Sequence, residues 1–492
     1  MAIEDKERNT NSSSTTDNVT EEAGKTDHRD LMKKNITLTR GISLVVGGII
    51  GTGIFITPNY ITQSVGAPAP SILMWGVGGL IAAAGGMSFC ELGTMFPVSG
   101  AEIAYIKRIY GPVPAFLTAW FNYFLLGGMY TAIGILGFTK YFWTIFYDNP
   151  ELQVPFWADK LLGLFVTFMF IGLTAFVPTL NVQSLVVENF LKITAILVII
   201  GAGFVHLIEG HTENISIGFE GTNPDPRGWA GALDGIIWSY YGWEMICGVT
   251  SEVQNPQRNV PIIVGVSVTT VSVLYILAVS CYHIVIPLTD IVKDTPIASQ
   301  FGLTTMGKFG KIFLALAVMV SSLGNVHCTF LAASRTIHSA AVEELLPEAL
   351  TLVSKRFKTP IVTVFYLGLV TGVFVVVGDL NGLIDSAVFT SFPFYVMCCV
   401  GVFVMRRRAP DMVRPYRVPL VFPAFFILFG IFAFVTPFTS QATWKISLMW
   451  VMVLMTGVPV YFLFVRNVFK LDCFHKASNR LTRFLATTLD CE

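Results

Sequence analysis

An apolar segment near the start of the chain contains a glycine-rich stretch, Gly-Gly-Ile-Ile-Gly-Thr-Gly-Ile-Phe, over residues 47–55. Glycine weakens a helix because it adds no side-chain packing and loses much backbone freedom on ordering. The triplet of Gly51, Thr52 and Gly53 therefore predicts that a helix breaks in the middle of this segment. Inside a bilayer such a break is tolerated only where the unwound backbone is buried in protein or lines a wet cavity. Its N–H groups can hold an anion and its carbonyls a cation.

Composition places this segment in a membrane. Hydrophobic residues make up 53% of the 492 residues and charged residues 13%, a balance typical of an all-α membrane protein that crosses the bilayer many times. Runs of about twenty apolar residues predict about twelve transmembrane helices. The predicted helices lie near 41–65, 70–96, 113–146, 158–178, 185–208, 229–253, 261–287, 311–341, 361–378, 383–405, 418–438 and 444–466.

The distribution of charge predicts the domain organisation and the orientation. Residues 1–37 are polar and predict a disordered tail, residues 38–470 form the transmembrane domain, and residues 471–492 form a C-terminal tail. Lys and Arg gather in the loops on the side of the N-terminus, so both tails are expected in the cytoplasm. A glycosylation sequon at Asn214 falls in a predicted outside loop, in agreement with this orientation.

A second break is predicted in the sixth span, over residues 238–244, Trp-Ser-Tyr-Tyr-Gly-Trp-Glu. Interrupted helices at corresponding positions of two halves are typical of an inverted-repeat transporter. The positions of the two breaks predict a repeat of five plus five helices, with the last two helices outside it. No residue-level identity between the halves supports the repeat.

The sequence lacks the patterns of other function classes. None of its eight cysteines lies in a predicted outside loop, so no disulfide framework is expected. No catalytic Ser/His/Asp set, metal-binding cluster or phosphate-binding loop is present. We therefore expect no enzymatic activity, no metal, no cofactor and no nucleic-acid partner.

Several motifs together resemble one family. They are the stretch 47–58, the loop 91–110, the segment 238–261 with Glu252, Asn255-Pro256, Arg258-Asn259 and Pro261, the pair Ser334-Arg335, and the Arg-rich turn after the tenth span. They resemble the L-type amino acid transporters, the light subunits of heteromeric amino acid transporters in the amino acid–polyamine–organocation superfamily. The resemblance covers residues from about 38 to 470.

The resemblance implies a twelve-helix plasma-membrane protein that exchanges amino acids by alternating access without sodium. The groups implied to hold the substrate carboxylate are Thr52, Gly53 and the Ile54 amide, next to Gly51. The carbonyls of Ile49, Trp238 and Tyr241 would hold the ammonium, and Trp238 would also be an aromatic lid. Thr52 has an alternative interpretation as a hydroxyl bonded to its own helix, and Trp238 as an ordinary core or interface aromatic.

Two further residues bear on ion coupling and selectivity. Lys192 in the fifth span occupies, by resemblance, the place of a sodium ion in sodium-coupled relatives, and is expected to brace carbonyls of the first span. Alternatively, its side chain reaches the cytoplasmic face. Glu244 stands where relatives carry Asn. It is a counter-charge for a cationic substrate, a proton carrier, or a neutral acid bonded to the unwound backbone.

The remaining candidates line the predicted side-chain compartment or a gate. Tyr241 is bulkier than the small or acidic residue common in relatives, and either narrows the pocket or bonds a polar substrate. Ser322 and Asn325 in the eighth span resemble positions that face the substrate. His327 nearby is either a hydrogen-bonded interior histidine or a proton relay. Phe389 and Phe392 in the tenth span either close the outside route or simply pack.

Light subunits of this family carry a cysteine in the outside loop between spans three and four, which binds a single-span heavy chain. Residues 147–157 here contain none. No disulfide-linked heavy chain is expected, while noncovalent pairing with a heavy chain and operation alone both remain open.

Three functions stay in competition. The first is a sodium-independent exchanger of neutral amino acids, large or aromatic. The second is cationic, mixed or proton-coupled uptake that uses Glu244. The third is an amino acid receptor without appreciable flux, which the Ser/Thr-rich N-terminal tail favours.

Overall fold

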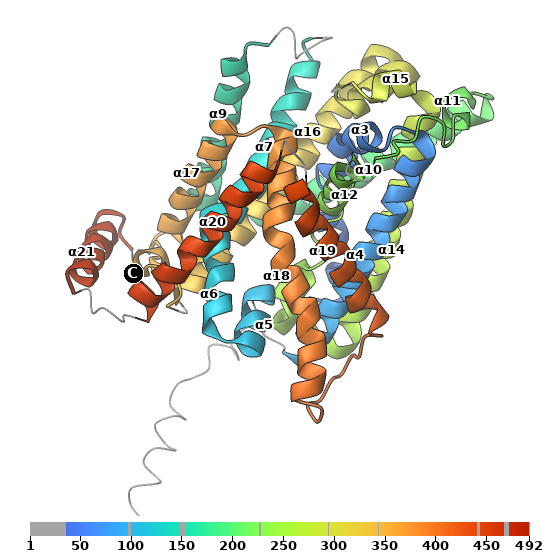
Figure 1. The fold of residues 1–492 in the computed structure, drawn as a ribbon. Helices are drawn as coiled ribbons and strands as arrows, with labels where there is room; N and C mark the ends of the chain where they lie inside the picture. Colours follow the sequence, from blue (N-terminus) through green and yellow to red (C-terminus); the bar gives the residue numbers. More distant parts are fainter. Residues whose placement is uncertain are drawn as a thin grey trace, which may run out of the picture.

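The computed structural model describes residues 36–96, 100–147, 154–225, 228–293, 295–342, 344–439, 443–466 and 472–491. Within these residues the chain is helical, with two isolated β-bridges and no strand. Figure 1 shows a bundle of long, roughly aligned helices with shorter helices at both ends.

The first half of the bundle follows the predicted order. Its helices are α2 (Leu38–Ile49), α3 (Gly53–Val65), α4 (Pro68–Met95), α5 (Ala101–Tyr110), α6 (Pro112–Phe121), the π-helical turn η2 (Asn122–Leu126), α7 (Gly127–Thr144), α9 (Phe156–Phe176), α10 (Pro178–Ile208) and α11 (Glu213–Ser216).

The second half and the two final spans complete the bundle. Their helices are α12 (Gly228–Ser239), α13 (Met245–Gly248), η3 (Thr250–Glu252), α14 (Pro256–Val285), α15 (Leu288–Ile291), α16 (Ile297–Val342), η4 (Glu348–Thr351), α17 (Ile361–Val377), α18 (Leu380–Arg408), α19 (Val421–Thr439), α20 (Trp444–Val460), η5 (Tyr461–Val465) and α21 (Asp472–Thr488).

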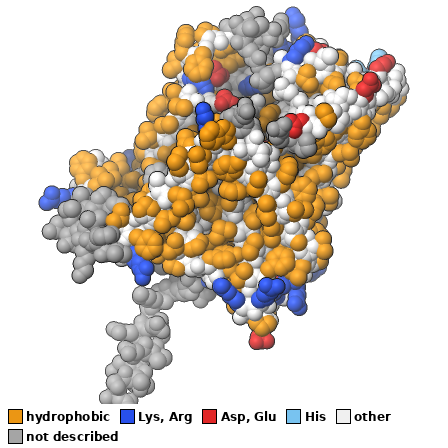
Figure 2. Space-filling model, viewed as in Figure 1, with side chains coloured by type: hydrophobic (Ala, Val, Ile, Leu, Met, Phe, Trp, Pro, Cys, Tyr) orange, Lys and Arg blue, Asp and Glu red, His pale blue; other side chains and the backbone are white. Residues whose placement is uncertain are grey.

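The described helices account for the predicted spans. By length and composition eight of them can cross a membrane, and the bent pair of α2 and α3 makes a ninth. The other three predicted spans coincide with shorter pieces: α6 to α7, α12 to α13, and the 17-residue α17. Hydrophobic side chains cover the middle of the face in Figure 2, and charged side chains lie toward its two ends.

Both predicted breaks are present. Helix α2 ends at Ile49 and α3 begins at Gly53, with a bend of 44° between them. In the sixth span, α12 ends at Ser239 and α13 begins at Met245, so the unwound stretch starts two residues later than the predicted one. Gly242 in this turn has a φ of +114°, a conformation that L side chains rarely adopt.

Helix contacts support the five-plus-five arrangement. The contact between α2 and α14 corresponds to the contact between α12 and α4. The contact between α10 and α14 corresponds to that between α18 and α4, and the contact between α10 and α16 corresponds to that between α18 and α7. Each pair maps onto the other when the first five spans are exchanged with the next five. The contact pattern therefore carries the internal symmetry that residue identity does not.

Three details differ from or extend the expectations. Ile36, assigned to the N-terminal tail, pairs with the backbone on either side of Val253. The loop after the second span contains a ten-residue amphipathic helix, α5. The C-terminal tail contains α21. Residues 1–35 of the predicted N-terminal tail lie outside the described residues.

Candidate substrate site at the two helix breaks

The two breaks meet backbone to backbone. A Cβ placed on Gly242 would lie 2.9 Å from the Gly48 carbonyl carbon and oxygen and 3.1 Å from Ile49 N. One on Gly53 would lie 2.5 Å from Ser239 Cα. Glycine allows this approach because any side chain would collide with the facing main chain. The unwound peptide groups of the two spans are thereby brought to one place.

The carbonyls at the first break are already partly engaged. Tyr275 on α14 donates its hydroxyl to Ile49 O at 3.0 Å, and Ser321 on α16 donates to Gly51 O at 3.0 Å. Ile49 O also accepts from Gly51 N at 2.8 Å, so both lone pairs of this carbonyl are engaged. In the sixth span, the Trp238 carbonyl accepts from Tyr241 N at 3.1 Å.

Thr52 lies at the first break, and its side chain makes no hydrogen bond within the described residues. It is fully buried, and its Oγ1 has no partner among the described residues. The alternative interpretation, a hydroxyl bonded to its own helix, is therefore not observed, whereas Thr57 and Ser239 do bond their own helices in this way. Because a buried hydroxyl without a partner is costly, Thr52 is a candidate binding group.

Ser322 shares this property and this location. Its side chain is fully buried and its Oγ also lacks a partner within the described part of the chain. A Cβ placed on Gly137 of α7 would lie 3.5 Å from both Ser322 Oγ and Thr52 Cγ2. The Ser322 hydroxyl and the Thr52 methyl group, from the eighth and first spans, therefore both lie against Gly137.

An aromatic wall closes one side of the site. The rings of Trp238 and Tyr241 are 6.2 Å apart and nearly parallel, and Tyr130 of α7 packs against them at 5.5 and 4.6 Å between ring centroids. Tyr395 of α18 donates to the Tyr241 hydroxyl at 3.0 Å. Sequence reasoning missed Tyr130 and Tyr395; a tyrosine in mid-span is the signal that was available, because its hydroxyl needs a partner there.

Glu244 bonds to the unwound backbone. It is 6% exposed, and its Oε2 accepts from Gly242 N at 3.2 Å. This contact matches the third of the three predicted interpretations. It stabilises the turn in which Gly242 has its left-handed conformation, and the other two interpretations are not tested by it.

Asn325 and Lys192 contact the first break from two sides. A Cβ on Gly51 would lie 3.0 Å from Asn325 Nδ2, so the amide covers that glycine. Lys192 is 1% exposed, and its Nζ donates to Gly47 O at 3.3 Å. The lysine is buried against the first span and does not extend to the cytoplasmic face, in agreement with the bracing geometry.

Comparison with known proteins decides the family. The amino acid permease family profile matches residues 36–459. The chain belongs to the amino acid permease family. The human cystine/glutamate transporter is 31% identical to this permease over 464 residues, which cover 93% of this chain and 91% of the relative. The human b(0,+)-type amino acid transporter 1 is 29% identical over 93% of both chains, and the mouse Asc-type amino acid transporter 1 is 27% identical over 93% of this chain and 86% of the relative. The resemblance inferred from the motifs is confirmed.

The two phenylalanines of the predicted gate pack mainly on α19, and Phe392 also contacts Tyr395 beside the aromatic wall, at 6.4 Å between ring centroids. Phe389 stacks on Phe434 at 5.0 Å and contacts Phe438, and Phe392 stacks on Phe426 at 4.8 Å. All three partners belong to α19, outside the repeat. These contacts favour the packing interpretation of both residues.

Two predictions concern the loops on the predicted outer side of the permease. Asn214 is half-buried and donates its Nδ2 to Ile284 O at 3.1 Å, so its glycosylation stays a prediction that requires this bond to open. Residues 148–153 of the loop predicted to lack a heavy-chain cysteine lie outside the described residues.

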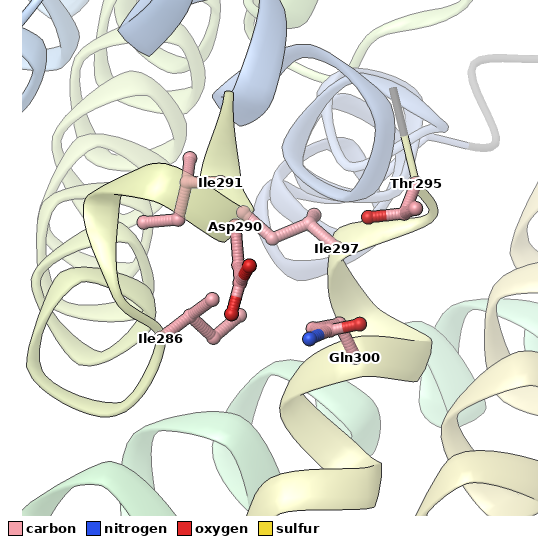
Figure 3. A pocket seen from close by; sticks show the side chains of 6 residues that line it. All are labelled: Ile286, Asp290, Ile291, Thr295, Ile297 and Gln300. Carbon is pink, nitrogen blue, oxygen red and sulfur yellow. The ribbon is translucent and has the colours of Figure 1, made fainter. Parts of the chain in front are cut away.

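A small recess at α15 is lined by Asp290 and Gln300 (Figure 3); its remaining lining residues are Ile286, Ile291, Thr295 and Ile297. Within the described residues, no group of three or more His, Cys, Asp or Glu side chains is placed to hold a metal ion.

Proposed function

We propose that this permease is a sodium-independent amino acid exchanger that works by alternating access. The observation that carries the proposal is the meeting of two helix breaks around the buried, unbonded hydroxyl of Thr52. The first turn of α3 offers N–H groups without intrahelical partners, which suit a carboxylate. The carbonyls at the end of α2 and of α12 suit an ammonium group.

Lys192 supports independence from sodium. Its ammonium already contacts the Gly47 carbonyl at 3.3 Å, so a fixed positive charge occupies the side of the first break that faces α10. A sodium ion at the same place would meet like-charge repulsion in a medium of low dielectric constant. The transporter therefore needs no cation to brace the unwound span.

The side-chain compartment supports a neutral substrate. Trp238, Tyr241 and Tyr130 present ring faces and Ser322 a hydroxyl, while the Glu244 carboxylate bonds Gly242 N. We infer that neutral amino acids, large or aromatic, are the primary substrates. Exchange follows if substrate contacts are what lower the barrier between the two orientations, so that the empty protein reorients slowly.

One observation favours a second candidate function. Glu244 is a buried carboxylate next to the aromatic wall, and intramembrane carboxylates are functional by default. If it turns from Gly242 N toward the substrate, it serves cationic or mixed specificity, or carries a proton. Competition by arginine that Glu244→Gln abolishes would support the first of these, and acid-stimulated uptake that Glu244→Gln abolishes would support the second.

The deciding experiment uses purified protein in liposomes. Uptake of a labelled neutral amino acid is measured with and without internal amino acid, in sodium and in choline buffers. Uptake that requires internal substrate and is equal in both buffers supports the proposal. Uptake into empty liposomes overturns exchange, sodium stimulation overturns the role of Lys192, and binding without flux identifies a receptor.

We also propose a plasma-membrane location with both termini in the cytoplasm, and no disulfide-linked heavy chain. Seven cysteines of the described part of the chain are free, six of them in the helices of the bundle. Migration on a non-reducing gel that matches the monomer, after expression with a candidate heavy chain, tests the last point. Co-purification in mild detergent would show noncovalent pairing.

A further inference from the structure

A charged cluster outside the proposed substrate site lies where α10 packs on α16. Glu188 and Lys192 are one turn apart on α10, and His327 faces Glu188 from α16. His327 Nδ1 is 3.8 Å from Glu188 Oε1, and the two side chains are 4% and 15% exposed. An acid, an ammonium and an imidazole thus share a nearly dry junction next to the first break.

Gly324 lies against the side chains of both Glu188 and Lys192. A Cβ at this position would lie 2.9 Å from Glu188 Oε2 and 3.2 Å from Lys192 Cε. Both side chains therefore rest on the same glycine backbone of α16. A larger residue would displace one of them, because neither contact leaves room for a methyl group.

Glu188 has unused capacity for a donor. Its Oε2 is buried and makes no hydrogen bond to any part of the chain that the structure describes. A protonated imidazole at the His327 position is a charged donor, and charge-assisted bonds of this kind are about twice as strong as neutral ones. Histidine is the side chain that changes charge between about pH 5 and 8.

Several other groups face the cluster. On α10, Lys192 interacts with Glu188, and the ring centroid of Phe170 of α9 lies 6.1 Å from that of His327. The Cys328 thiol of α16 also interacts with Lys192 and Glu188. From α2, the Gly47 carbonyl accepts the Lys192 ammonium.

We propose that Glu188 and His327 form a proton-binding site that controls how firmly Lys192 holds the first span. The proposal rests on the transport function proposed above. When His327 is neutral, Glu188 is the counter-charge of Lys192. When His327 takes a proton from water, Glu188 pairs with the imidazolium instead. The Lys192 ammonium is then left with the Gly47 carbonyl as its partner, and this hydrogen bond between α10 and α2 becomes stronger.

The hydrogen bond from Lys192 to Gly47 opposes one step of alternating access. α2 has to move relative to α10 for the inner side of the site to open, as rocking of one helix group against the other requires. Protonation therefore slows exchange. The sign is fixed by the charges: acid adds a positive charge beside Lys192 and removes its counter-charge, and both changes push the ammonium toward the carbonyl.

The test compares exchange in liposomes at about pH 6 and about pH 7.5, with equal pH on both sides. For the unaltered protein we expect about a threefold or larger fall in exchange rate at the lower pH. His327→Asn keeps a hydrogen-bonding group without a titratable charge, and should exchange at the same rate at both pH values. Glu188→Gln should be slow at both, because Lys192 loses its counter-charge permanently.

His338→Asn is the matched control. His338 lies on the same helix and bonds Leu350 O through Nδ1 at 3.1 Å, away from Lys192, so this variant should keep the pH response of the unaltered protein. A pH response that survives in His327→Asn, or exchange by the unaltered protein that is equal at both pH values, overturns the proposal. Thermal unfolding of each variant at about pH 7.5 checks that it folds.

A second readout does not depend on flux. Val46→Cys, in a background with Cys473 and Cys491 changed to serine, places a thiol in α2 where the side chain is 7% exposed. Its maleimide labelling, compared with the same variant carrying His327→Asn, should slow at the lower pH because α2 stays docked. If labelling of Val46→Cys slows at the lower pH but the protein exchanges no amino acid, the transport function is overturned and the proton site is kept. If labelling responds to pH equally with and without His327→Asn, the proton site is overturned.

Discussion

The hydroxyl of Tyr60 on α3 donates to both carboxylate oxygens of Asp385 on α18, each at 3.1 Å. The tyrosine ring crosses α12 over two glycines: a Cβ on Gly231 would lie 2.7 Å from the Tyr60 hydroxyl oxygen, and one on Gly235 would lie 3.3 Å from Cδ1. One side chain thus joins the first, sixth and tenth spans. Tyr60 follows the first break, whereas Lys192 bonds to α2 before it. In the orientation proposed above, Tyr60 would hold the outer side closed while Lys192 holds the inner side.

We expect Tyr60→Phe to open the outer side more often. A hydrogen bond to a charged group contributes about 1.5–3 kcal/mol, so its loss shifts the equilibrium roughly 10-fold or more. The measurement is the labelling rate of Ser64→Cys by an impermeant maleimide added from outside, in cells. Tyr110→Phe, which removes the bond from Tyr110 to Met397 O, is the control and should leave labelling unchanged. Equal labelling rates in the two variants would show that the Tyr60 hydroxyl does not hold the outer side closed.

Thr52→Val should weaken substrate binding without destabilising the fold. The change keeps the shape and removes an Oγ1 that has no partner in the described structure, so thermal stability should hold or rise slightly. The loss of one bond to a carboxylate predicts a roughly 10-fold or larger rise in substrate Kd. Thr52→Ser restores the hydroxyl and should restore affinity. If Thr52→Val binds normally, Thr52 is not a ligand.

Gly242→Ala should abolish transport. The residue combines a φ of +114° with main-chain atoms 2.9 Å from the added Cβ, and the left-handed conformation alone costs alanine about 1–2 kcal/mol. The breaks would be forced apart. Gly248→Ala is the control, since its nearest neighbour is the Ala101 Cβ at 3.9 Å. Size-exclusion profiles and uptake distinguish misfolding from loss of the site, and wild-type uptake by Gly242→Ala would refute the close contact.

Arg406→Met should lower the folding stability, because it leaves the buried Glu91 carboxylate with Val418 N and with the Arg414 guanidinium, whose Nε lies 3.7 Å from Glu91 Oε1. Glu91 is 1% exposed and accepts from Arg406 Nε at 3.0 Å and from Val418 N at 2.8 Å. Removing one partner of a buried ion pair costs about 3–5 kcal/mol. Arg407→Met, at an exposed neighbour, should be tolerated. Folded yield in detergent measures both, and partial recovery in Glu91→Gln/Arg406→Met would identify the carboxylate as the cause.

Glu102→Gln should stabilise the protein in base more than in acid. Glu102 lies in α5, between the predicted spans, and burial raises its pKa from 4.5 to about 7. The unfolded chain loses this proton near pH 4.5 and the folded chain near pH 7, so the stability due to Glu102 is complete below the first value and is lost as the pH rises through the second. The advantage of the variant should grow over this window to on the order of 1–3 kcal/mol and then stay constant. Melting curves at several pH values check this, and a constant difference would contradict it.

Much of the site could be predicted because unusual residues in a membrane span have few explanations. Glycines at Gly51, Gly53 and Gly242 indicated the two breaks, since a helix in lipid has no reason to carry such a cluster unless backbone must approach backbone. The buried charge of Lys192 indicated a partner inside the bundle for the same reason, and this partner is Gly47 O. The exact end of the sixth-span helix was two residues off because its unwinding depends on the Glu244 to Gly242 contact.

The sequence by itself determined that the chain spans the membrane, that two of its spans break, and that small residues lie at the breaks, because bilayer thickness and backbone hydrogen bonding allow few other solutions. Only the tertiary structure decided which side chains converge. Tyr130, Ser321, Tyr60 with Asp385, and Glu188 with His327 come from spans far apart in the chain. Their partners depend on helix packing, and helical periodicity within one span says which face a residue occupies but not which helix lies opposite.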